Sequence, residues 1–168
     1  ASGCYDHTFP RMTAKTQKYY GRAPAEVERV AALADAIEEQ KPALPDGSPM
    51  TVERLQLMGS DFGMKPSFER MHWIIDHAFV DGDGTLSCGA SVSDSFLMRA
   101  FERTNTRTNP LYWTLQEFIY ADGDTMPIRW AAAEEKAHRA EFDTLARPLM
   151  FTGEAMFPWM FEQMPELK

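Results

Sequence analysis

Near its C-terminus the chain reads Leu149-Met150-Phe151-Thr152-Gly153-Glu154-Ala155-Met156-Phe157-Pro158-Trp159-Met160-Phe161. Apart from Thr152, Gly153 and Pro158, the only residue of this stretch that is not apolar is Glu154. A carboxylate is costly in apolar surroundings unless a partner satisfies it. The stretch therefore predicts a segment around which the rest of the chain is organised, and in which Glu154 meets a cationic group.

The length and composition fit a single globular domain. The chain has 168 residues, of which 44% are hydrophobic and 25% charged, and these values are ordinary for a protein with a real core. The formal net charge is -8, whereas a nucleic-acid binder normally needs a basic surface. We therefore expect no nucleic-acid partner.

Targeting signals and cysteine sites are not indicated either. No apolar run approaches the roughly 20 residues that span a bilayer, and the N-terminus lacks the pattern of a signal peptide. Cys4 and Cys88 are the only cysteines and lie too far apart in sequence to indicate a disulfide framework or a cysteine metal site. The expectation is a soluble, cytoplasmic protein with no membrane contact, no metal and no cofactor.

Apolar residues recur at helical spacing in seven segments, which span 5–22, 24–37, 52–58, 67–79, 93–103, 111–121 and 128–142. Pro24 suits a first helical turn, and Thr51, Ser67 and Asn109 stand where N-caps are expected. No segment reads as a strand and no internal repeat is found. The predicted fold is all-α, a compact irregular array of about seven short helices.

The predicted helix 111–121 has two non-polar faces, which is more than packing onto one core requires. Leu111, Leu115 and Phe118 form an aliphatic side, whereas Trp113, Glu117 and Tyr120 form a second stripe at i, i+4 and i+7. A carboxylate between two aromatic rings is typical of a pocket that binds a cation beside a flat apolar group. The alternative is an internal ion pair between Glu117 and an arginine such as Arg129.

Two Glu-x-x-His motifs raise the alternative of a carboxylate di-metal protein. They are Glu69 with His72 and Glu135 with His138, and Glu117 and Glu154 could supply the two further carboxylates. Such bundles use long straight helices, whereas prolines and glycines cut this chain into short ones. We therefore interpret the four motif residues as surface or capping groups.

Other motifs are incomplete. Segment 59–63 (GSDFG) has its serine one place early for a nucleophile elbow, and segment 89–93 lacks the second glycine. Segment 81–92 starts like a calcium loop but carries Leu86 and Val92 where glycine and glutamate are needed. The sequence therefore offers no catalytic residue.

Trp73 stands on the polar side of its predicted helix, where an exposed aromatic could mark a contact with another domain.

Six segments carry a further signal through their order and spacing. They are Thr51-Val52-Glu53-Arg54-Leu55, Phe68-Glu69-Arg70-Met71-His72-Trp73, Asn109-Pro110-Leu111-Tyr112, Leu115-Gln116-Glu117-Phe118-Ile119-Tyr120, Trp130-Ala131-Ala132 and Phe151-Thr152-Gly153-Glu154-Ala155-Met156-Phe157-Pro158-Trp159. Together they resemble the longer proline iminopeptidases (prolyl aminopeptidases). In that family these segments belong to a helical cap inserted into an α/β-hydrolase domain. The resemblance implies a single cap domain over 1–168, with the catalytic domain absent from this chain.

The resemblance also implies a function. The parent would be a serine peptidase, an aminopeptidase that releases N-terminal proline from peptides by a Ser-His-Asp triad. The implied partners are an α/β-hydrolase catalytic domain and a peptide with an N-terminal proline. Without a nucleophile, this chain is expected to be inactive alone.

Site residues follow from the same resemblance. Glutamates of such caps contact the substrate amine, and Glu117 and Glu154 are the carboxylates within the matching motifs. The apolar part of the site would be lined by Trp113, Tyr120, Phe151, Phe157 and Trp159. The alternative from a different class is a stand-alone helical binding or interaction module in which both glutamates form internal pairs.

Overall fold

A computed structural model describes the chain except for residues 1, 79–90, 122, 124–126 and 168. Within the described residues the structure contains eight α-helices, four short 3-10 helices and no strand, with one isolated bridge between Ala43 and Pro49. The all-α prediction is confirmed. None of the helices in the described ranges is long and apolar enough to cross a membrane.

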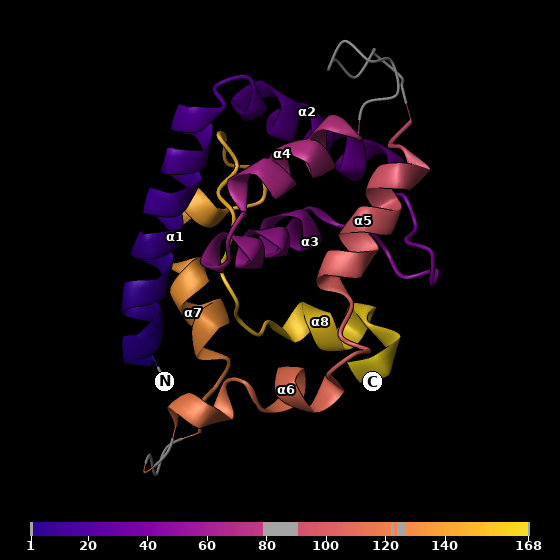
Figure 1. The fold of residues 1–168 in the computed structure, drawn as a ribbon. Helices are drawn as coiled ribbons and strands as arrows, with labels where there is room; N and C mark the ends of the chain where they lie inside the picture. Colours follow the sequence, from indigo (N-terminus) through magenta and orange to yellow (C-terminus); the bar gives the residue numbers. More distant parts are fainter. Residues whose placement is uncertain (1, 79–90, 122, 124–126, 168) are drawn as a thin grey trace.

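The helices form an irregular array rather than a bundle (Figure 1). α1 runs down one side, α5 lies on the opposite side, α3 lies between them and α6 lies at one end (Figure 1). In chain order the elements are α1 (Ser2–Arg22), α2 (Glu26–Gln40), α3 (Val52–Leu57), η1 (Met58–Gly63), α4 (Phe68–Asp76), α5 (Asp94–Thr104), α6 (Pro110–Leu115), η2 (Phe118–Tyr120), α7 (Ala131–Ala137), η3 (Ala140–Phe142), α8 (Pro158–Gln163) and η4 (Pro165–Leu167).

Two of the three predicted N-caps are confirmed. The side-chain oxygens of Thr51 and Asn109 accept the backbone N–H three residues later, at 3.4 and 3.1 Å. Ser93, where the predicted helix 93–103 starts, caps α5 in the same way at 3.1 Å. Ser67 makes no such bond, so that prediction is wrong. Its backbone is already helical, at φ -101° and ψ -42°, whereas a capping side chain needs an extended backbone to reach back to the helix.

Segment 149–157 crosses the core as irregular chain. The side chains of Leu149, Phe151 and Met156 are fully buried. The Thr152 N–H donates to the Gln56 carbonyl on α3 at 2.9 Å, and the Gln56 side-chain amide donates to the Met150 carbonyl at 3.1 Å. These contacts satisfy backbone groups that no helix or sheet satisfies. The stretch that organised the sequence therefore lies at the centre of the fold.

Two predicted helices are shorter than expected. The helix predicted at 111–121 ends at Leu115, and Gln116 and Glu117 turn inward to buried positions before η2 begins. The helix predicted at 128–142 begins only at Ala131. Arg129 and Trp130 have φ values of 57° and 56°, in the left-handed region that a right-handed helix cannot contain.

Candidate functional site

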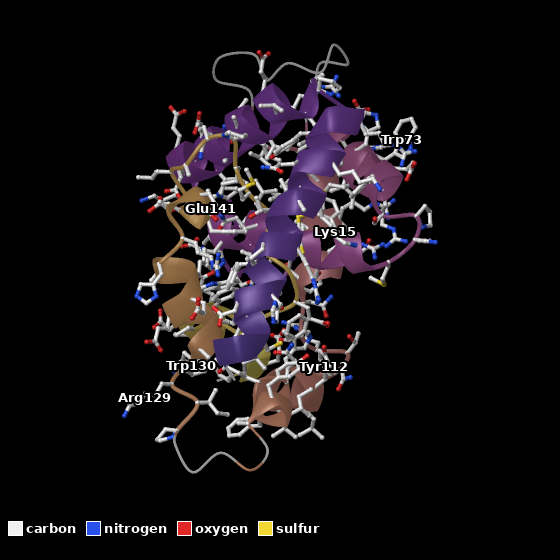
Figure 2. All side chains as sticks on the ribbon, turned by 90° about the vertical axis from the view of Figure 1, so that its left-hand side faces the viewer. Lys15, Trp73, Tyr112, Arg129, Trp130 and Glu141 are labelled. Atoms are coloured by element: carbon white, nitrogen blue, oxygen red, sulfur yellow. The ribbon has the colours of Figure 1, made fainter. Side chains whose placement is uncertain are left out.

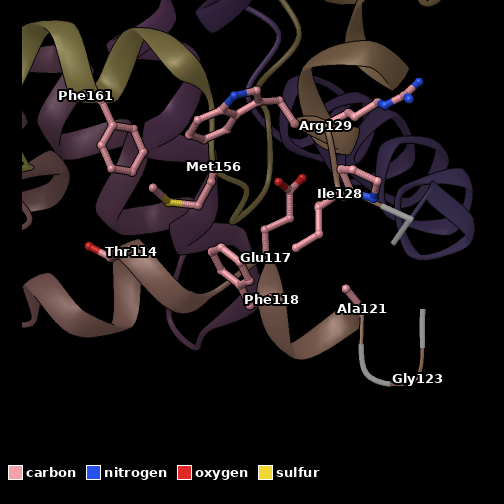
Figure 3. A pocket seen from close by; sticks show the side chains of 11 residues that line it. Thr114, Glu117, Phe118, Ala121, Gly123, Ile128, Arg129, Met156 and Phe161 are labelled. Carbon is pink, nitrogen blue, oxygen red and sulfur yellow. The ribbon is translucent and has the colours of Figure 1, made fainter. Parts of the chain in front are cut away.

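A cavity of about 720 Å³ lies beside the turn between α6 and η2. Glu117 projects into it, and most of the side chains around the carboxylate are apolar (Figure 3). They come from three separate parts of the chain: Phe118 in η2, Ile128 and Trp130 before α7, and Met156 and Phe161 from the C-terminal segment. The tertiary fold thus places one carboxylate in an apolar hollow.

Glu117 is buried, with 6% of its surface exposed. Its Oε1 accepts the N–H of Ala132, in the first turn of α7, at 3.1 Å. Burial raises the pKa of Glu117, and hydrogen bonds from the N–H groups of Ala132 and Ala131 act in the opposite direction. The carboxylate is therefore held by backbone dipoles in a site that disfavours its charge.

Arg129 does not neutralise this charge. It lines the same cavity, but its guanidinium points away from Glu117 (Figure 3). Within the part of the chain that the structure describes, no ion pair joins the two residues. The internal pair considered for Glu117 is therefore not formed with Arg129.

Glu154 is exposed rather than buried, so the expectation of a carboxylate enclosed by apolar side chains is wrong. The chain bends at Glu154, and the Gly153 backbone lies against α1 so closely that a Cβ there would be 3.0 Å from Met12 Cγ. The apolar neighbours of Glu154 in sequence turn into the core while its own side chain turns out. Burial of a segment does not bury every residue in it.

A cluster of three tyrosines, Tyr5, Tyr112 and Tyr120, links the two glutamates and is called the tyrosine cluster below. Burial raises the pKa of Tyr112, and a hydrogen bond to Glu154 adds to this effect. Burial likewise raises the pKa of Tyr5, and the charge of Glu117 adds to it. The rings of Tyr5 and Tyr120 meet edge to face, with centroids 6.5 Å apart. Burial raises the pKa of Tyr120, and the charge of Glu154 adds to this effect. Glu117 and Glu154 thus reach one aromatic cluster from two sides.

The other predicted lining residues do not converge on the Glu117 cavity. Phe151 lies in the core against Phe62, with ring centroids 5.3 Å apart. Phe157 and Trp159 stack at 6.3 Å and line a separate cavity of about 350 Å³. Trp113 packs partly buried against the core, and Tyr120 is exposed at the tyrosine cluster.

Some of the residues that line the Glu117 cavity stand in segments that the sequence analysis had singled out. Phe118 belongs to the aliphatic side of the predicted helix 111–121, and Trp130 and Met156 lie within the segments that carry the family resemblance. Ile128 and Phe161 could not be assigned to this cavity from the sequence, because only the folded chain brings them next to Glu117.

Three of the residues considered for a di-metal site contact different partners and not one another. Glu69 pairs with Arg22, the His72 ring contacts the buried Glu26 at 2.8 Å, and Glu135 lies 3.8 Å from Arg139. Among the described residues, no group of three or more His, Cys, Asp or Glu side chains could hold a metal ion. The predicted calcium-like turn at 81–92 lies largely outside the described residues.

Comparison with known proteins confirms the resemblance drawn from the sequence. A proline iminopeptidase of Aeromonas sobria is 33% identical over 171 residues, which cover 99% of this chain and 37% of the relative. Proline iminopeptidase aneH of Aspergillus aculeatus is 30% identical over 165 residues, covering 95% of this chain and 35% of the relative. No family model matches the chain. The chain thus spans little more than a third of the length of these relatives.

Proposed function

We propose that this chain, which is similar to one part of the proline iminopeptidases, is the substrate-recognition cap of such a serine peptidase. The cap would bind the amine of a peptide that begins with proline and gate the active site. An α/β-hydrolase domain outside this sequence would supply the nucleophile and cleave the bond. The observation that carries the proposal is the buried Glu117 carboxylate in a mostly apolar cavity, where no lysine, arginine or histidine side chain of the described residues forms an ion pair with it.

An N-terminal proline suits this cavity chemically. Its secondary ammonium is a cation with two N–H donors, and its ring is apolar. Charge-assisted hydrogen bonds to a carboxylate strengthen where water is excluded, and Glu117 has only 6% of its surface exposed. Trp130, Met156 and Phe161 would pack on the pyrrolidine ring and the next residue.

Glu154 would act as the second carboxylate. Its exposed side chain lies at the tyrosine cluster, next to the Tyr112 hydroxyl. A carboxylate at that position attracts an ammonium that approaches from solvent, and the tyrosine rings offer it a cation–π surface. We infer that Glu154 helps to draw the amine toward the site, while Glu117 holds it.

The outer face of α6 and η2 would dock on the catalytic domain. Leu111 and Phe118 are 71% and 62% exposed, and Leu115 and Ile119 are exposed beside them. Exposed apolar patches of this kind mark interfaces. Phe118 belongs both to this face and to the wall of the Glu117 cavity. Nearly two thirds of the Aeromonas sobria relative lies outside the match, which leaves ample chain to cover the face.

The decisive test is the kinetics of Glu117→Gln in the full-length enzyme with a proline arylamide. Loss of a charged hydrogen bond costs about 1.5–3 kcal/mol, so we expect KM to rise roughly 10- to 100-fold. The kcat value should change little, because the substitution removes binding rather than a reacting group. Glu134→Gln, an exposed position on α7, removes the same charge and should leave KM unchanged. An unaltered KM in the Glu117 variant would refute the amine role.

The second candidate function, a helical interaction module without catalysis, is favoured by one contact. Glu117 already caps the first turn of α7 through Ala132, as a purely structural glutamate would. In that case Glu117→Gln would lower the stability of the chain and leave proline-substrate kinetics unaffected.

A further inference from the structure

A second cavity, of about 180 Å³, lies between α4 and α5 and is rich in arginine. It is lined by Arg70, Trp73, Ile74 and His77 from the first helix and its end, and by Arg99 and Arg103 from the second. We propose that this cavity binds a small oxyanion, a phosphate or a carboxylate group.

Helix geometry brings these side chains together. On α4 and at its C-cap, Arg70, Trp73 and His77 follow one another at intervals of three and four residues, so they share one face. On α5, Arg99 and Arg103 are one turn apart and share a face in the same way. α4 and α5 are in direct contact, so the two faces meet and enclose the cavity.

The described carboxylates leave this cluster with an excess of positive charge. Asp61, which is 4% exposed, lies 3.3 Å from Arg70 Nη1 and 3.8 Å from Arg103 Nη1. Glu102 pairs with Arg99 at 3.3 Å on the open surface, where such pairs are weak. Three guanidinium groups therefore share two carboxylates, in a chain whose net charge is -8.

One donor of the cluster has no partner of its own. The Nε atom of Arg103 is buried and forms no hydrogen bond within the described part of the protein. A buried unsatisfied donor costs free energy, and Arg103 lines the cavity, so an anion bound there would lie beside this guanidinium. The Asp61 carboxylate faces the Nη1 ends of Arg70 and Arg103 instead.

The shape and chemistry of the cavity indicate the class of ligand. Guanidinium groups bind carboxylate and phosphate oxygens through paired N–H donors. A cavity of this volume holds one such group rather than a nucleotide or a folded peptide segment. Trp73 is 59% exposed and offers a flat apolar wall beside the arginines for the carbon part of a carboxylate ligand.

The oxyanion site is separate from the Glu117 cavity. Trp73 lies toward one end of the molecule, whereas Tyr112 and Trp130 lie toward the other (Figure 2). Among the residues that the structure describes, none lines both cavities. The proposal therefore does not depend on the role of Glu117, and either can fail without the other.

The test is a titration of the 168-residue chain with inorganic phosphate and, separately, with succinate, followed by two-dimensional NMR at constant ionic strength. We expect saturable shifts of the Trp73 indole N–H and of amides in α4 and α5. Tighter binding of phosphate would identify a phosphate site, and tighter binding of succinate a carboxylate site.

Surface variants keep the test independent of folding. Arg99→Gln, at a side chain that is 58% exposed, should weaken binding about tenfold, and Trp73→Ala should weaken succinate binding more than phosphate binding. Arg11→Gln, at an exposed position on α1 that is not among the residues lining the cavity, removes the same charge and should leave the affinity unchanged. Shifts that do not saturate with either anion, or an equal loss in the Arg11 variant, would overturn the proposal.

Discussion

The Glu117 carboxylate accepts the N–H of Ala132 at 3.1 Å. This bond joins the turn after α6 to the first turn of α7, across a segment that contains two left-handed residues, Arg129 and Trp130. Glu117 therefore organises the wall of its own cavity. A substrate amine would meet a carboxylate that is already held in position, which lowers the entropic cost of binding.

The raised pKa of Glu117 predicts a pH dependence of stability. The folded protein binds a proton at this site more readily than the unfolded chain, because burial disfavours the charged carboxylate. Between the ordinary glutamate pKa and the raised folded value, the free energy of unfolding should fall as pH rises. Urea unfolding of the wild type and Glu117→Gln at a series of pH values from about 4 upward measures this difference. If the free energies of unfolding of the two proteins change with pH in parallel, the predicted effect of Glu117 is absent.

Gly59 should not tolerate a side chain. A Cβ there would lie 2.5 Å from Phe151 Cβ and from the Thr152 carbonyl oxygen, so the backbone of the central segment would have to move. We expect Gly59→Ala to lower the free energy of unfolding by about 1–3 kcal/mol. Gly63→Ala is the control, because a Cβ at that position meets nothing within 4 Å. Equal stability of the two variants in denaturant unfolding would refute the close approach.

Gln56 should matter more for stability than a typical polar residue. Its side-chain amide donates to the Phe142 and Met150 carbonyls at 3.0 and 3.1 Å, and its oxygen accepts from Lys136 Nζ at 2.8 Å. Replacement by leucine would leave buried carbonyls without donors, so Gln56→Leu should cost about 2–4 kcal/mol. Gln17→Leu, at an exposed position on α1, should change the thermal unfolding temperature little. A small effect at Gln56 would mean that water replaces its bonds.

The apolar face of α6 and η2 should be needed for docking and not for folding. Leu111→Lys combined with Phe118→Lys should abolish binding of this chain to a separately produced catalytic domain, while its circular dichroism spectrum stays unchanged. Leu145→Lys, at another exposed leucine, should retain binding. If the double variant still binds, the face is not the interface with the catalytic domain.

Local signals explain how much of the fold could be predicted. The caps at Thr51, Ser93 and Asn109 act on an N–H only three residues away, so the helices after them could be located from the sequence. The start of α1 was less accessible, because Pro10 could either interrupt or begin the helix predicted at 5–22. Pro10 lies inside this helix. Proline has no N–H, so the Asp6 carbonyl one turn earlier has no helical donor. The helix continues because Asp6 and Pro10 are both exposed.

The candidate site was only partly accessible from the sequence. The sequence singled out Glu117 because a carboxylate between aromatic residues at helical spacing is unusual, and the structure buries that residue in an apolar cavity. The sequence treated Glu154 as the enclosed carboxylate, and the structure exposes it. Apolar composition indicates that a segment is buried, but the direction of each side chain depends on the elements that pack against the segment.

By itself the sequence determined the helical class, most helix starts and the resemblance to proline iminopeptidases. These properties depend on residues close together in the chain or on the order of short segments. Tertiary structure alone decided that the aliphatic side of α6 faces outward and that Ile128 and Phe161 meet at Glu117. Such contacts join residues far apart in sequence, so they arise only when the 149–157 segment crosses the core and brings these elements together.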